Sequence, residues 1–85
     1  MTREEQLDAV KVSINIVGTH LDNTLGIWLD DVKCYMRDAG VIEETLNSEK
    51  AIGAICRGVT DLYVNGALSN YFYQRVAQLS LEVSE

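Results

Sequence analysis

Apolar residues recur every three or four positions between Leu21 and Ala39, and this spacing most constrains the fold of the chain. The period is typical of an amphipathic helix, and it predicts a helix over this segment with polar and acidic residues on its other face. Thr19 or Asp22 is expected to cap its start, and Gly40 is expected just after its end. The apolar positions are Leu21, Leu25, Trp28, Leu29, Val32, Met36 and Ala39.

Three further segments carry helical signals. Thr2 and Glu5 have the spacing of a capping box, in which each side chain bonds the backbone N–H of the other residue. Ser48 and Ser69 are good N-caps before two later apolar stripes, the last of which has Val83 as a further candidate member. These predicted helices cover residues 3–13, 49–64 and 70–81.

The connections are marked by glycine. Residues 12–17 alternate like a short strand but have no second strand to pair with, so we expect a helix end and an ordered loop closed by Gly18. Residues 43–47 are expected to form a polar connection, and Gly66 to end the third helix. The other glycines lie inside predicted helices, where each costs about 1 kcal/mol relative to Ala, so we expect a helix of this chain or a neighbouring copy to approach closely there. These are Gly26, Gly53 and Gly58.

The whole chain is predicted to form one all-α domain, a small bundle of about four helices spanning residues 1–85. It has 85 residues, of which 47% are hydrophobic, and no Pro. A domain of this size buries only about 60–65% of its unfolded surface, so its own core gives little stability and oligomerisation is a common remedy. The expected core anchors are Trp28, at the centre, with Leu29, Ile55 and Phe72.

The charge of the chain argues against two classes of partner. Thirteen Asp and Glu against seven Lys and Arg give a net charge of −6, the wrong sign for gripping a phosphate backbone or an anionic membrane. The residues after Met1 lack the basic and then apolar pattern of a secretion signal, and no apolar run approaches the roughly 20 residues of a membrane span. We therefore expect neither membrane insertion nor sequence-specific binding of DNA.

Residues that could carry chemistry are few. His20 is the only histidine and has no nucleophile motif beside it, and Cys34 and Cys56 lack the spacing of a metal site or a disulfide framework. Both thiols are expected to be reduced and mostly buried. The sequence thus predicts no catalytic, cofactor-binding or metal-binding residue, no small-molecule substrate and no enzyme. The paired carboxylates Asp30–Asp31 and Glu43–Glu44 are expected to be solvated.

Three consecutive aromatic residues begin the last predicted helix, close to Tyr63. Successive helical residues point about 100° apart, so Tyr71, Phe72 and Tyr73 cannot all face one core. One interpretation is partial exposure of amphipathic tyrosines; the other is an anchor in a protein interface, where Tyr is enriched. The second makes Tyr71 and Tyr73 part of one subunit-interface patch, with Arg75 at its rim.

The segments LDAVKVSINI, THLDNTLGIWLDDVKCYMRDAGV, EKAIGAICRGVTDLYVNG and SNYFYQRVAQLSLE follow one another over Leu7 to Leu81. In this order the chain resembles a family of head–tail connector proteins of tailed bacteriophages and prophages, the all-helical adaptors of DNA packaging. The landmarks of the resemblance are hydrophobic spacings together with Asp22, Gly40 and Gly66.

The resemblance implies a non-enzymatic structural subunit that forms a homo-oligomeric ring beneath the portal protein. The ring would extend the DNA channel, let DNA pass without sequence-specific binding, and dock a tail or head-completion protein. Such a protein would reside in the virion or in the cytoplasm of the bacterial host. The alternative is a small acidic cytosolic regulator or inhibitor that buries the aromatic cluster against one protein partner.

Overall fold

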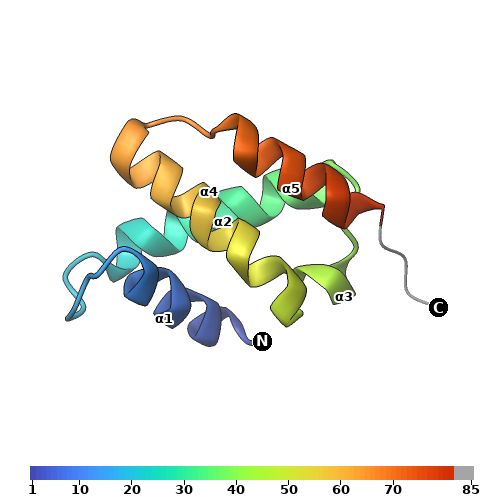
Figure 1. The fold of residues 1–85 in the computed structure, drawn as a ribbon. Coiled ribbons are helices and arrows are strands. Elements are labelled where there is room, and N and C mark those ends of the chain that lie inside the picture. The colour runs from blue at the N-terminus through green and yellow to red at the C-terminus, as the bar shows by residue number, and fades with distance from the viewer. Residues whose placement is uncertain (82–85) are drawn as a thin grey trace.

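The computed structural model describes residues 1–81 and is all-α over that range, with no strand (Figure 1). The predicted fold class is therefore confirmed. The candidate stripe residue Val83 lies outside the described residues. The helices are α1 (Arg3–Ser13), α2 (Asp22–Asp38), α3 (Glu43–Leu46), α4 (Glu49–Asn65) and α5 (Asn70–Ser80).

The four long helices end within about one residue of the predicted bounds, as their period and caps require. Thr2 and Glu5 form the predicted capping box, and the side chains of Ser48 and Ser69 cap α4 and α5. The start of α2 was predicted wrongly. Its cap residue is Leu21, which makes no side-chain hydrogen bond. Asp22 is instead the first helical residue, and its carboxylate pairs with Lys11 of α1 at 2.8 Å.

Helix α3 is one short turn of helix in a segment that was expected to be an irregular connection. Its formation follows from packing, because Leu46 is fully buried in the core and the neighbouring Thr45 is also buried. Glu43 and Glu44 occupy its first turn, where carboxylates interact favourably with the helix dipole. No periodic signal can reveal so short an element, because it contains a single turn.

Helix α4 is the centre of the bundle and contacts every other helix of the described chain. In Figure 1 it crosses the front of the molecule over α2, with α1 on one side and α5 on the other. One hydrophobic core joins all five elements. Its buried apolar members are Val10, Leu25, Leu29, Val32, Met36, Val41, Leu46, Ala51, Ala54, Ile55, Val59, Phe72, Val76 and Leu79.

Trp28 is not the central core anchor that the sequence indicated. It is only partly buried and packs edge-on against Tyr63 at the margin of the core, with ring centroids 6.0 Å apart. The reason is the phase of α2: its buried stripe passes through Leu25 and Leu29, and Trp28 lies about 100° away from Leu29. The other three expected anchors, Leu29, Ile55 and Phe72, are 0% exposed.

Gly58 lies where side chains of α2 and α5 pack closely against α4. A Cβ atom built there would lie 2.6 Å from Cε1 of Phe72 in α5 and 2.9 Å from Cγ1 of Val32 in α2. Gly26 is similarly crowded, but by the flexible guanidinium of Arg3, at 2.7 Å. Among residues 1–81 a Cβ atom built at Gly53 would have no neighbour within 4 Å, so the expected close approach of a second helix is not found there.

Candidate protein interface

The junction between α4 and α5 is fixed by a buried carboxylate. Asp61, in the last turns of α4, is only 2% exposed, and its Oδ2 accepts hydrogen bonds from the backbone N (3.1 Å) and hydroxyl (2.6 Å) of Ser69. Its Oδ1 pairs with Nε of Arg57 at 3.2 Å. Gly66 reverses the chain between them with a left-handed φ of 73°, a conformation that favours glycine. The first residues of α5 are therefore held in one orientation.

This orientation separates the three consecutive aromatic residues. Phe72 is 0% exposed, whereas Tyr71 and Tyr73 are 56% and 42% exposed. Because Tyr71 and Tyr73 flank Phe72 along the helix, they lie on opposite sides of its buried stripe. They contact different helices, α4 and α2, and so do not form the single patch that the sequence suggested.

The Tyr73 side of α5 faces α2. The aromatic ring of Tyr35, in α2, lies 5.5 Å from that of Tyr73 and 5.7 Å from that of Phe72. Tyr73 also meets Phe72 edge-on, with ring centroids 5.9 Å apart, so it packs against its neighbour in the helix. These distances are typical of favourable aromatic pairs, so Tyr35 and Tyr73 pack against each other and against Phe72.

Tyr35 also borders a groove of about 250 Å³ between α2 and the α4–α5 connection. We call this the acidic groove, because two carboxylates, Asp31 and Asp38, stand on its α2 side. Neither forms a hydrogen bond or ion pair with any residue of the range 1–81. Its lining residues are Asp31, Val32, Cys34, Tyr35, Asp38, Leu62 and Leu68.

The Tyr71 side of α5 is basic. The guanidinium of Arg57, in α4, lies 5.4 Å from the ring centroid of Tyr71, within the range of a cation–π contact. Arg75 follows Tyr71 by one helical turn and so shares its side of α5. Arg75 Nη1 donates a hydrogen bond to Oε1 of Gln78 at 2.7 Å, and we call the stripe formed by Tyr71, Arg75 and Gln78 the basic stripe.

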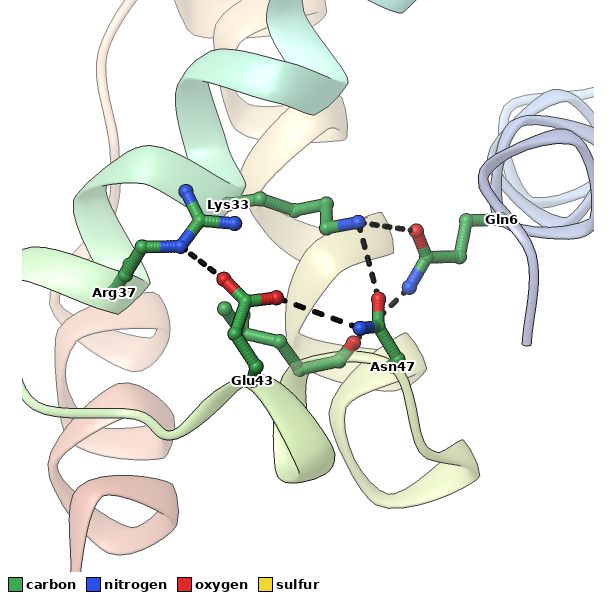
Figure 2. Close-up of polar contacts among 6 residues, drawn as sticks. Gln6, Lys33, Arg37, Glu43 and Asn47 are labelled. Atoms are coloured by element: carbon green, nitrogen blue, oxygen red, sulfur yellow. Dashed lines mark hydrogen bonds and ion pairs between the residues drawn. The ribbon is translucent and has the colours of Figure 1, made fainter.

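A polar network involving Lys33, in the same C-terminal half of α2 as the groove, holds α2 to α1 and α3 (Figure 2). Gln6 is fully buried; its Nε2 donates to the Leu46 carbonyl at 3.0 Å, and its Oε1 accepts from Lys33 Nζ at 2.9 Å. Figure 2 shows Lys33 reaching between Gln6 and Asn47, whose Oδ1 lies 3.3 Å from Nζ. Each buried polar atom of Gln6 thus has a partner, and the network is structural.

An ion pair between Arg37 and Glu43 continues this network. The hydrogen bond from Arg37 holds the pKa of the Glu43 carboxyl below its ordinary value. In the same way, the hydrogen bond from Arg3 lowers the pKa of Asp30. Both carboxylates of these pairs are exposed, so the pairs contribute modestly to stability.

The cysteines differ from each other in burial. Cys34 is exposed in the acidic groove, which corrects the expectation of two mostly buried thiols; α2 places it on the side opposite its buried stripe. Cys56 is half-buried, and burial raises the pKa of its thiol. His20 is exposed in the connection before α2.

No group of three or more His, Cys, Asp and Glu within residues 1–81 is placed to hold a metal ion. None of the helices described is both long enough and apolar enough to cross a membrane.

Sequence reasoning missed several parts of this surface. Tyr35 follows Trp28 by seven positions, which is two helical turns, and that spacing could have placed it on the same side of α2. Asp61 carried no signal, since an acidic residue inside a helix is usually exposed. The acidic groove brings α2 together with Leu62 and Leu68, and no local pattern predicts such a juxtaposition.

Comparison with protein-family models, curated proteins and solved structures gives no match to this chain. The fold itself defines a small all-α bundle around the central helix α4. Helix α5 exposes one tyrosine on each side of its buried stripe, Tyr71 and Tyr73.

Proposed function

We propose that this protein is a structural subunit of a phage or prophage head–tail connector. Several copies form a ring on the portal protein, extend the DNA channel and present a docking surface to a tail or head-completion protein. The protein acts by binding and carries out no catalysis. The proposal starts from the resemblance over Leu7 to Leu81 and is supported by the surface of the bundle.

The observation that carries the proposal is the exposure of Tyr71 and Tyr73 on opposite sides of the buried stripe of α5, whose first residues are held by Asp61. A subunit of a closed ring meets two neighbours through two different patches, because each contact joins unlike surfaces. A protein that inhibits one partner needs only one patch. Two separate patches, each with an exposed tyrosine, on one small bundle therefore favour the connector over the regulator.

The net charge of −6 is compatible with a channel through which DNA moves. An acidic wall repels phosphates, so a passing duplex does not adhere to it. The same charge favours solubility of the subunits before they assemble.

The test is recruitment by the portal protein of the same phage or prophage. Wild type should join the portal complex in several copies. The double variant Tyr71→Asp with Tyr73→Asp should fail to join, because a carboxylate on each aromatic surface must then be desolvated. Failure of wild type to join in multiple copies would contradict the proposal, and a single copy on another protein would favour the regulator.

The control places the same charges on other exposed apolar residues. Val12, in α1, and Val64, at the end of α4, are both exposed and lie outside the two aromatic surfaces. The double variant Val12→Asp with Val64→Asp has the same net charge as the tyrosine variant, and it should join the portal as wild type does. Far-ultraviolet circular dichroism should show both double variants folded.

A further inference from the structure

Charged groups of opposite sign lie on the two flanks of α5, carboxylates of α2 on the flank that faces α2 and Arg75 on the other, and none of them forms an ion pair within residues 1–81. On one side, Asp31 and Asp38 of the acidic groove form no ion pair with residues 1–81. On the other side, Arg75 of the basic stripe has only its hydrogen bond to Gln78. Most other cations are engaged: Arg3, Lys11, Arg37 and Arg57 pair with carboxylates, and Lys33 binds Gln6 and Asn47.

We propose that the basic stripe of one copy docks into the acidic groove of the next copy, head to tail. Tyr71 packs against the apolar lining of the groove, and Arg75 meets Asp31 and Asp38. The proposal rests on the connector function, for which it names the contact between neighbouring subunits.

Chemical complementarity supports a second copy as the occupant. The groove offers apolar side chains, Leu62 and Leu68, beside two carboxylates that form no ion pair within residues 1–81, which fits an aromatic residue followed closely by a cation. Tyr71 and Arg75 provide that pair, one helical turn apart on the same side of α5.

The two surfaces cannot meet within one molecule. The buried stripe through Phe72 and Val76 lies between them, with Tyr73 toward α2 and Tyr71 toward α4. When two copies dock, one of them keeps an unoccupied acidic groove and the other keeps an unoccupied basic stripe. A further copy can bind at either end of this dimer, so the same contact can repeat to form a ring or an open chain.

The test uses two charge-reversed variants of the full chain. The stripe variant is Arg75→Glu, and the groove variant is Asp31→Lys with Asp38→Lys. Each variant alone places like charges at the contact and should self-associate at least about tenfold more weakly than wild type. An equimolar mixture should associate again, because both possible contacts between unlike variants join opposite charges. The measurement is sedimentation velocity from micromolar to millimolar concentration.

The control tests the effect of net charge alone. Asp8 and Glu44 are exposed and lie on α1 and α3, away from the groove. Asp8→Lys with Glu44→Lys changes the net charge as the groove variant does, so it should associate at least as strongly as wild type. If it also loses association, or if the mixture of stripe and groove variants stays monomeric, the proposed contact is wrong.

Cys34 gives a second readout because it lines the groove. Its alkylation should slow as wild type associates and should stay fast in each charge-reversed variant at the same concentration. Alkylation that stays fast under associating conditions would overturn the proposal.

The connector function and this contact can fail separately. Wild type that remains monomeric at millimolar concentration, yet joins the portal in several copies, overturns the proposed contact alone. If wild type self-associates through the complementary charges but does not bind the portal protein, the connector function alone is overturned.

Discussion

Asp61 holds the start of α5 by accepting two hydrogen bonds from Ser69, at 3.1 Å from its backbone N and 2.6 Å from its hydroxyl. Ser69 in turn accepts a hydrogen bond from the backbone N of Phe72 at 3.3 Å. A buried carboxylate in α4 thereby orients the cap of α5, and the cap orients the aromatic residues that follow. The position of Tyr71 and Tyr73 on two separate surfaces depends on this chain of contacts.

Asp61→Ala should destabilise the protein by about 2–4 kcal/mol, because it leaves the Ser69 donors and Arg57 without their buried acceptor. Urea denaturation followed by circular dichroism measures the free energy of unfolding. Asp38→Ala is the matched control, since Asp38 is exposed and forms no ion pair within residues 1–81; its effect should stay within about 0.5 kcal/mol. Equal effects of the two substitutions would contradict the role given to Asp61.

Gly58→Ala should destabilise the protein by about 1–3 kcal/mol, because the added Cβ meets Phe72 and Val32 in a packed core. The loss should exceed the gain of about 1 kcal/mol that Ala brings to a helix. Gly53→Ala provides the control in the same helix. It has open space around it and should stabilise the protein by about 0.5–1 kcal/mol. A stabilising Gly58→Ala would refute the close approach of α2 and α5 to α4.

Phe72→Ala should cost about 3–5 kcal/mol, enough to unfold much of so small a domain, because the side chain is fully buried. Trp28→Ala should cost less, about 1–2 kcal/mol, since Trp28 is only partly buried and its main aromatic partner, Tyr63, is exposed. Thermal denaturation of the two variants compares them directly. A larger loss for Trp28→Ala would restore it as the central anchor.

Acidification should destabilise the fold through the Arg37–Glu43 and Arg3–Asp30 pairs. The pKa of Glu43 and of Asp30 is lower in the folded chain than the ordinary values of 4.5 and 3.8. Their contribution to stability is therefore complete above the ordinary pKa and is lost as the pH falls through it toward the folded pKa. The melting temperature should thus drop between about pH 5 and pH 3.

Glu43→Gln should remove part of that dependence, because the amide cannot titrate. Glu44→Gln is the control, an exposed neighbour with no ion pair among residues 1–81. High salt should also reduce the effect of pH, since both pairs are exposed to solvent. An unchanged pH profile in Glu43→Gln would show that the pair does not stabilise the fold.

The helices were predictable because their signals are local. The apolar period of α2 and the caps Thr2, Ser48 and Ser69 depend on residues only three or four positions apart, and packing did not override them. The cap of α2 was mispredicted because Asp22 finds a better partner in Lys11, which belongs to another helix. The role of Trp28 was mispredicted because periodicity gives the phase of a helix only to within about one residue.

The candidate interface was predictable only in part. Three consecutive aromatic residues required at least one to point outward, and both Tyr71 and Tyr73 do. Their separation into two surfaces depends on Tyr35 and Arg57, which lie far from them in the sequence. The acidic groove likewise exists only once α2 packs beside Leu62 and Leu68.

The most direct test of the connector function is native mass spectrometry of the portal complex mixed with an excess of this protein. The account predicts one dominant species that carries a fixed number of copies greater than one, and it predicts that this species is absent with the Arg75→Glu variant. A portal complex that carries no copy, or a single copy, would contradict the central claim.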